Sequence, residues 1–254
     1  MTALMAYRSI SRWSGALGVC AIVAVIRPAH AAEPKAVVEL FTSQGCSSCP
    51  PADRILGELA KDPSIIAISL PIDYWDYLGW KDTLADSRFS ARQKAYSHVR
   101  GDRDVYTPQM VVNGAAHVIG SDRARIEGAI RDTGKAGKVM SVPVTMSLSG
   151  KQLTVSVAGG KEGAPVQGEI WLCSISKAVP ISISRGENRG RQVIYHNVVR
   201  NLLKVGDFNG NPGSWTVPLD SVVRDGIDAA AVLVQGGRSN KPGPMLGAAF
   251  KSLH

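Results

Sequence analysis

The chain has 254 residues, of which 44% are apolar and 20% charged, an ordinary globular composition that excludes collagen-like, coiled-coil and disordered classes. This length is enough for one large domain or two modest ones. The formal charge is +8, but Lys and Arg are dispersed along the chain and do not alternate with aromatic residues, which argues against a nucleic-acid-binding protein.

The first 31 residues have the pattern of a secretory signal peptide. Arg8 and Arg12 give a positive start, residues 16–26 carry no charge, and residues 29–31 place small side chains at a cleavage site. A membrane-spanning helix needs about 20 apolar residues, so no permanent membrane anchor is expected. The sequence predicts cleavage near Ala31 and an exported protein, periplasmic or secreted.

The mature chain is predicted to begin with a strand, a cysteine loop and a helix. Residues 36–41 form an apolar run typical of a buried strand, and Cys46 and Cys49 follow at its exit. Apolar side chains then repeat at helical spacing over residues 52–60. The two prolines after Cys49 lack N–H groups and restrain the residues before them, so the helix is expected to begin near Pro51.

The next elements continue this alternation of strands and helices. Thr107-Pro108 stands just before a strand, and Asn113-Gly114 is typical of a two-residue hairpin turn. Ser121 is the expected N-cap of the last helix. The remaining predicted elements are a strand at 65–72, a helix at 83–99, strands at 109–112 and 115–119, and a helix ending near residue 130.

The composition shifts to Gly, Lys and Asp between residues 131 and 141, which indicates a linker. The alternation of apolar and polar residues beyond it is typical of antiparallel strands, expected at 142–148, 153–157, 169–176, 192–199, 215–217 and 229–234. The sequence therefore predicts an α/β domain over residues 34–132, followed by a mainly antiparallel, sandwich-like β domain over residues 141–254.

Cleavage of the signal peptide removes Cys20 and leaves one close pair, Cys46 and Cys49, and one single cysteine, Cys173. A pair at a strand-to-helix junction suits thiol–disulfide exchange, because free N–H groups at a helix N-terminus stabilise a thiolate. Cys46 is expected to be the exposed, attacking thiol, and Cys49 to resolve the mixed disulfide.

The chain resembles the thioredoxin superfamily over residues 34 to about 130, through the segment 39–53. Along most of its mature length it is similar to a family of exported thioredoxin-like proteins known only as a domain of unknown function, through 73–80, 186–188 and 195–200. The resemblance implies a thioredoxin-like fold and a thiol–disulfide oxidoreductase without cofactor or metal.

The same resemblance assigns supporting residues. It implies that Pro108 is cis and lies against the cysteines, and that the backbone of Thr107 pairs with an extended peptide. It also implies that Glu39 is the buried acid that takes the proton of Cys49. The expected partners are a peptide or protein thiol and a redox partner.

Other interpretations of the cysteines remain open. The pair could form a structural disulfide in a non-catalytic binding module. Zinc is disfavoured, because there is no second pair and His98, His117 and His196 are scattered along the sequence. Cys173 is expected to be a small core residue on a strand face shared with Trp171 and Ile175, with a third redox thiol as the alternative.

Three further features each allow two interpretations. Glu39 could instead be a strand-end carboxylate bonded to backbone or water. The aromatic residues at 74–80 are expected to pack between domains, with peptide binding as the alternative. The charged region 185–200 is expected to be a solvated loop, with a docking surface for an acidic partner as the alternative.

Overall fold

A computed structural model describes residues 33–160 and 167–253. The predicted signal peptide and Cys20 lie outside the described residues. The fold is mixed α/β with one large, mostly antiparallel sheet of eight strands in the order β11-β10-β7-β8-β2-β1-β3-β4, and a second sheet in the order β5-β6-β9. The described residues form one compact unit.

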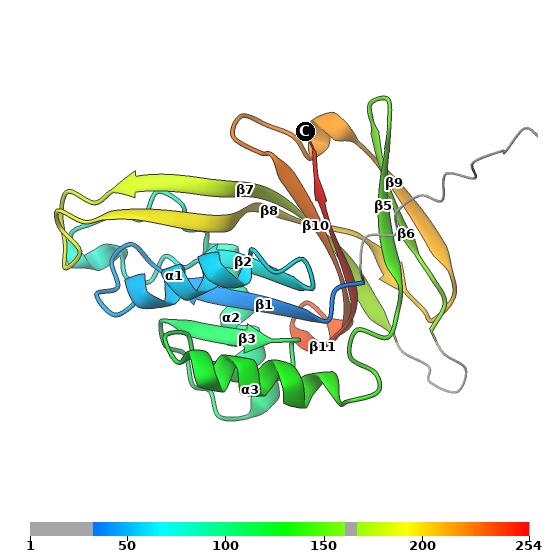
Figure 1. Cartoon of the computed structure of the whole chain (residues 1–254), viewed down its shortest axis with the longest axis horizontal. Helices are drawn as coiled ribbons and strands as arrows, with labels where there is room; N and C mark the ends of the chain where they lie inside the picture. Colours follow the sequence, from blue (N-terminus) through cyan, green and yellow to red (C-terminus); the bar gives the residue numbers. More distant parts are fainter. Residues whose placement is uncertain (1–32, 161–166, 254) are drawn as a thin grey trace, which may run out of the picture. The chain divides into compact units, whose positions relative to one another are not determined.

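The helices and strands alternate in the first half, and strands predominate in the second (Figure 1). The helices are α1 (Pro50–Leu59), α2 (Ser87–Arg100) and α3 (Arg123–Gly134). The strands are β1 (Ala36–Thr42), β2 (Ile65–Pro71), β3 (Gln109–Val112), β4 (Ala116–Ile119), β5 (Val144–Ser149), β6 (Gln152–Val157), β7 (Gly168–Ser182), β8 (Gln192–Phe208), β9 (Gly213–Pro218), β10 (Ala229–Arg238) and β11 (Lys241–Ser252). Short 3-10 turns lie at Asp76–Leu78 and Leu219–Ser221.

Strand β1 is buried along its whole length because helices cover both faces of the sheet around it. Val38 and Leu40 pack with residues of α1 and α3, whereas Val37 and Phe41 pack with residues of α2 on the opposite face. β1 pairs in parallel with β2 and antiparallel with β3. The predicted sequence of strand, cysteine loop and helix is confirmed.

The predicted turn at Asn113-Gly114 is also confirmed. Both residues have positive φ, +52° and +63°, as this two-residue hairpin requires. Asn113 Oδ1 accepts a hydrogen bond from the backbone N–H of Val37 at 2.8 Å, so the turn is fastened to β1. This contact holds the β3–β4 hairpin beside the strand that leads to the cysteines.

Two helix starts differ from the predictions because the chain uses other caps. α2 begins at Ser87 rather than residue 83, since the Asp86 side chain accepts from the N–H of Arg88. α3 is capped by Asp122 rather than Ser121, through a bond from the N–H of Arg125. An aspartate next to the expected cap takes its place in the second case.

The second half supplies the remaining strands of the large sheet. β7 and β8 form a long antiparallel hairpin that extends beyond the predicted strands, and β8 pairs in parallel with β2 at Ser69 and Val198. β11 was not predicted because Pro242, Gly243 and Pro244 resemble a loop. It lies at the sheet edge, where a proline without an N–H is tolerated.

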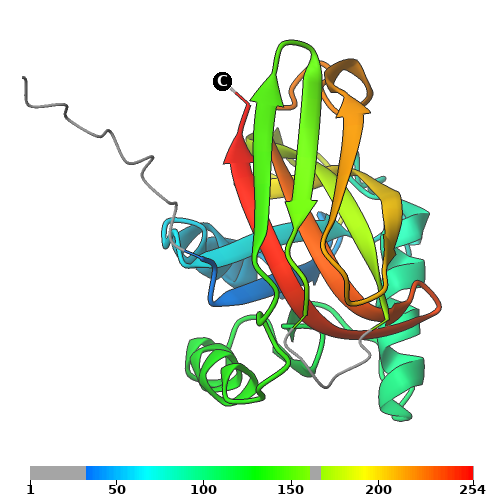
Figure 2. The same cartoon turned by 90° about the vertical axis from the view of Figure 1, so that its right-hand side faces the viewer.

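The three-stranded sheet packs against the large sheet through a second apolar cluster. Leu153 and Val155 of β6 meet Ile170 and Leu172 of β7 and Val232 of β10 in this cluster. Figure 2 shows these three strands in front of the long strands of the larger sheet. The expected antiparallel character of the second half is confirmed.

Candidate functional site

Cys46 and Cys49 form a disulfide at the start of α1, with their Cα atoms 5.4 Å apart. The backbone turns tightly here: the N–H of Cys46 bonds to Ser43 O, and the N–H of Cys49 to Cys46 O. Cys49 is the N-cap of α1, and its carbonyl accepts from the N–H of Asp53. The helix begins at Pro50, one residue before the expected Pro51. The prolines suit this position because the first helical N–H groups need no intrahelical partner.

The expectation that Cys46 is exposed is wrong. Cys46 is only 3% exposed and Cys49 is fully buried, although Ser47 and Ser48 between them are exposed. The physical reason is a contact from the turn between β7 and β8, where Asn188 Nδ2 donates to the carbonyl oxygens of Gln44 and Cys46 at 2.9 and 2.8 Å. The sequence placed Asn188 in a solvated loop.

The Thr107–Pro108 peptide bond is cis, as the resemblance implied. Gly120 lets this loop approach α1: a Cβ built on Gly120 would lie 3.1 Å from the Cβ atoms of both Pro108 and Ala52, and Ala52 is in the first turn of α1. The structure therefore brings Pro108 to the same helical turn that follows Cys49.

Aromatic side chains of the 74–80 segment connect this loop to the cysteine loop. Trp75 Nε1 donates to Thr107 Oγ1 at 2.7 Å. Trp75 also lies against Gly45, because a Cβ built on Gly45 would come within 3.2 Å of the Trp75 Cβ. Trp80 Nε1 donates to Gln44 Oε1 at 2.8 Å. Tyr77 is 76% exposed and stacks on Trp75. The segment therefore combines packing with one exposed ring.

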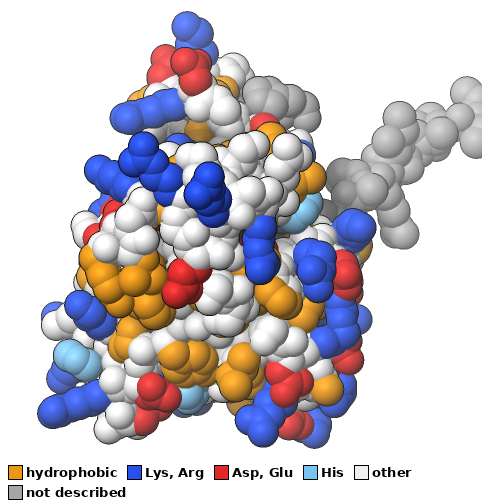
Figure 3. Space-filling view, turned by 90° about the vertical axis from the view of Figure 1, so that its left-hand side faces the viewer, with side chains coloured by type: hydrophobic (Ala, Val, Ile, Leu, Met, Phe, Trp, Pro, Cys, Tyr) orange, Lys and Arg blue, Asp and Glu red, His pale blue; other side chains and the backbone are white. Residues whose placement is uncertain are grey.

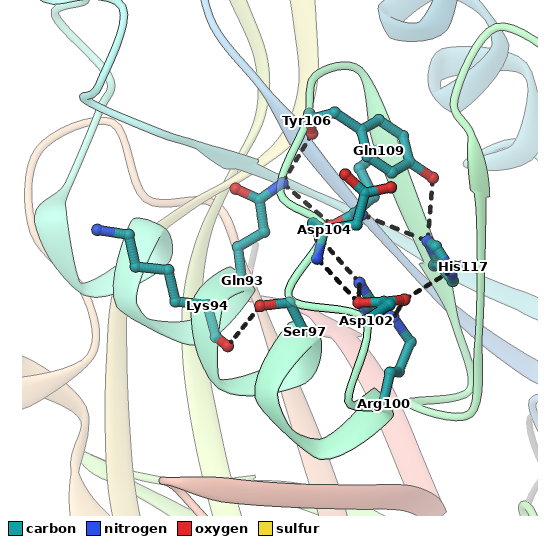
Figure 4. Close-up of polar contacts among 9 residues, drawn as sticks. All are labelled: Gln93, Lys94, Ser97, Arg100, Asp102, Asp104, Tyr106, Gln109 and His117. Atoms are coloured by element: carbon teal, nitrogen blue, oxygen red, sulfur yellow. Dashed lines mark hydrogen bonds and ion pairs between the residues drawn. The ribbon is translucent and has the colours of Figure 1, made fainter.

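A polar network on the other side of the loop fixes the residues that flank Thr107–Pro108 (Figure 4). Gln93 of α2 donates through Nε2 to Tyr106 O at 2.8 Å and to Gln109 Oε1 at 3.1 Å. The Tyr106 hydroxyl meets His117 Nδ1 at 3.1 Å, and His117 Nε2 lies 3.5 Å from Asp102. Burial lowers the pKa of His117, and the Arg100 guanidinium lowers it further.

Glu39 is buried, but its partners differ from those expected. Its carboxylate accepts from Arg92 Nε at 2.7 Å and from the Tyr96 hydroxyl at 2.5 Å, so side chains of α2 bind it. Glu39 lies on the strand face that packs against α2, as Val37 and Phe41 do, whereas α1 covers the opposite face. The structure therefore does not bring Glu39 together with the disulfide.

Replacing Arg92 by methionine is expected to lower the free energy of unfolding by about 3 to 5 kcal/mol, because the carboxylate of Glu39 would stay buried without its cation. Urea unfolding at neutral pH measures this loss. Arg88→Met is the matched control one turn earlier in α2, where the ion pair with Asp86 is exposed and contributes at most about 1 kcal/mol. The double variant Glu39→Gln/Arg92→Met should recover part of the lost stability, because no buried charge is left unpaired. If Arg92→Met lowers stability no more than Arg88→Met does, Arg92 does not neutralise Glu39 in the folded protein.

Two buried acids on the cysteine side were not predicted. Asp53 Oδ1 accepts from the Thr42 hydroxyl at 2.9 Å, while Oδ2 has no hydrogen-bond partner within the described chain. Burial raises the pKa of Asp53 to about 8, and burial also raises the pKa of Asp82 to about 6. Asp53 lines an open cavity of about 510 Å³ together with His196. The only sequence signal was the position of Asp53 in the first turn of a predicted helix. An aspartate is common there because it interacts favourably with the helix dipole, so the position alone does not indicate a functional acid.

Cys173 lies in the apolar cluster beside Ile175, with Trp171 packed against it, as predicted for a core residue. It is a buried free thiol, and burial raises its pKa to about 12. Such a thiol is largely protonated at neutral pH and is a poor nucleophile.

Within residues 33–160 and 167–253, no group of three or more His, Cys, Asp or Glu side chains is arranged to hold a metal ion. None of the helices described has the length and apolar character needed to cross a membrane.

Fold and site together define a mixed α/β protein with a buried disulfide at a helix start and a cis peptide bond before Pro108. The chain belongs to the family described as protein of unknown function DUF1223, whose model matches residues 37–235. A crystal structure of a protein from Agrobacterium tumefaciens is similar, with a TM-score of 0.77 and 30% identity, covering 86% of this chain and 94% of that one.

Two other proteins are similar to this chain, one in fold and one over a short stretch of sequence. HBP35 of Porphyromonas gingivalis shares the fold with a TM-score of 0.56 at 13% identity, covering 87% of this chain and 76% of its own. A probable thioredoxin of Archaeoglobus fulgidus is 38% identical over 37 residues, 15% of this chain and 41% of that protein. The chain thus matches less than half the length of this curated relative.

Proposed function

We propose that the protein is an exported thiol–disulfide oxidoreductase that acts on peptide or protein thiols through Cys46 and Cys49. The observation that carries this proposal is the disulfide at the N-cap of α1, whose first turn is separated from Pro108 by Gly120. Two cysteines that close a small ring at a helix start can exchange, because a thiolate that attacks one sulfur releases the other cysteine as a thiolate.

The surrounding fold supports a thioredoxin-like assignment. Elements β1 to α3 follow the order β-α-β-α-β-β-α, with strands ordered β2-β1-β3-β4 in the sheet. The match to a probable thioredoxin supports the same assignment. The second sheet packed on the large one supports a sandwich-like second half. Export would place the disulfide in an oxidising compartment.

The exchange step balances without a cofactor. A substrate thiolate attacks Sγ of Cys46, the Cys46–Cys49 bond breaks, and Cys49 leaves with the electron pair. Asp53, on the following helical turn and largely protonated at neutral pH, supplies the proton to Cys49. A second substrate thiolate then attacks the substrate sulfur and releases Cys46. The substrate loses two electrons and the protein gains them; the reverse sequence reduces a substrate disulfide.

The reduction potential of the purified mature protein tests this function. We expect a value between about −270 and −120 mV, the range between reducing and oxidising dithiol proteins. The measurement equilibrates the protein with glutathione buffers and counts free thiols by alkylation and mass. A potential below about −300 mV, typical of structural disulfides, would contradict the proposal.

A non-catalytic binding module with a structural disulfide is the second candidate. The burial of both sulfur-bearing residues favours it, since a reactive disulfide must be reached by a thiol. The same potential separates the two candidates.

A further inference from the structure

The turn that joins β7 to β8, residues 183–191, is called the hairpin tip here. Its backbone is closed by its own bonds, from Gly190 N to Ile183 O and from Arg191 N to Asn188 O. Gly186 and Gly190 have positive φ, +72° and +83°. The tip is therefore a preformed turn that begins at the buried Ile183 and in which exposed residues surround the buried side chain of Asn188.

The tip rests on the cysteine loop at one point and on the neighbouring aromatic segment 74–80 at another. Asn188 binds the carbonyls of Gln44 and Cys46, as described above. Gly186 contacts Trp80, where a Cβ on the glycine would come within 3.2 Å of the Trp80 Cβ. Figure 1 shows the tip at the same end of the sheet as the loop before α1. Figure 3 views that end, where hydrophobic side chains lie among scattered Lys and Arg.

The contact with the cysteine loop is suited to release. Asn188 Oδ1 is buried without a hydrogen-bond partner in the part of the chain described. An unpaired buried acceptor carries a desolvation cost, which offsets part of the gain from the two bonds made by Nδ2. When the tip lifts, this oxygen can accept hydrogen bonds from water.

We propose that the hairpin tip is a cover over the disulfide that selects polypeptide thiols, with Asn188 as its latch. This inference rests on the proposed exchange function. Lifting the tip uncovers Cys46 and leaves the carbonyls of Gln44 and Cys46 free. The backbone N–H groups of an extended polypeptide replace the amide of Asn188 there, whereas a small thiol has no backbone to offer.

Three variants test the cover. Asn188→Ala removes both bonds to the cysteine loop. Gly186→Ala keeps Asn188 but forces the tip away from Trp80. Gly190→Ala is the matched control, because it introduces the same kind of backbone strain at positive φ while a Cβ there meets nothing within 4 Å.

Two readouts separate the cover from the exchange reaction. The first is alkylation of Cys46 in the reduced protein, by iodoacetamide and by a maleimide carrying a polyethylene glycol chain, followed by mass spectrometry. The second is the rate of disulfide exchange with dithiothreitol and with reduced, unfolded ribonuclease A. For each readout, the rate with the large reagent is divided by the rate with the small one.

Asn188→Ala is expected to raise the alkylation ratio about tenfold, because the two hydrogen bonds that hold the tip are lost. It should lower the exchange ratio by a similar factor, because dithiothreitol then no longer needs a backbone to displace the tip. Gly186→Ala should shift each ratio in the same direction as Asn188→Ala, and Gly190→Ala should leave both as in the wild type. Equal changes with large and small reagents would overturn the cover, since Asn188 would then only position the cysteine loop. So would a Gly190→Ala effect equal to that of Gly186→Ala. Raised alkylation ratios without exchange in any variant would support the cover and overturn the exchange function.

Discussion

Cys46→Ser is expected to reduce thiol–disulfide exchange to the uncatalysed rate, because no disulfide can form and Cys49 alone is fully buried. Cys49→Ser should instead retain attack by Cys46 and accumulate mixed disulfides, since no second thiol resolves them. Oxidised substrate and each variant are mixed, the reaction is quenched with acid, and the protein mass reports the trapped partner. The two variants therefore fail in different ways.

Cys173→Ala is the matched control for these cysteine variants. Its thiol is buried in the core, and burial raises its pKa to about 12, so exchange should proceed at the wild-type rate without it. Exchange by Cys46→Ser at the wild-type rate, or its loss in Cys173→Ala, would show that the reactive thiol has been assigned wrongly.

Asp53→Asn is expected to stabilise the protein increasingly as the pH rises. The pKa of Asp53 is raised by burial to about 8, well above its value in the unfolded chain. Below about pH 4 the carboxyl is protonated in both states and contributes no pH dependence. Between about pH 4 and 8 the unfolded state releases the proton first, so the wild type loses about 1.4 kcal/mol per pH unit, up to about 6 kcal/mol.

The asparagine variant keeps the oxygen that accepts from Thr42 but cannot ionise, so this loss disappears. Urea unfolding at intervals across this pH range measures the difference between the two proteins. Asp132→Asn, on the exposed surface of α3, is the control and should keep the wild-type profile. If stability depends on pH in the same way for Asp53→Asn and wild type, the pKa of Asp53 in the folded protein is not raised above its value in the unfolded chain.

Local patterns in the sequence were enough to predict the elements that carry the cysteines. The apolar run of β1 and the helical spacing in α1 are produced by burial within single elements, so they are visible without the fold. Asn113-Gly114 is equally local, because the turn itself requires positive φ. The strand β11 was missed because its prolines and glycines are typical of a loop. Only the fold shows that this segment lies at a sheet edge, where such residues are tolerated.

The cover and the buried acids depend on contacts between distant residues. Asn188 stands among charged residues, and its burial arises from carbonyls 142 and 144 positions away. Glu39 was expected to be buried, but no local signal identifies Arg92, 53 positions later, as its partner. These features appear only when the sheet brings the two halves of the chain together.

The pairing of β2 with β8 has a consequence for how the protein is made. Asn197 Nδ2 binds Ala67 O across 130 residues, beside the point where Ser69 meets Val198. While the chain emerges stepwise from its amino end, the apolar strand β2 has no neighbour on this side until most of the polypeptide has followed. An unprotected edge invites pairing with other chains, so a newly made chain can aggregate through this edge until β8 arrives.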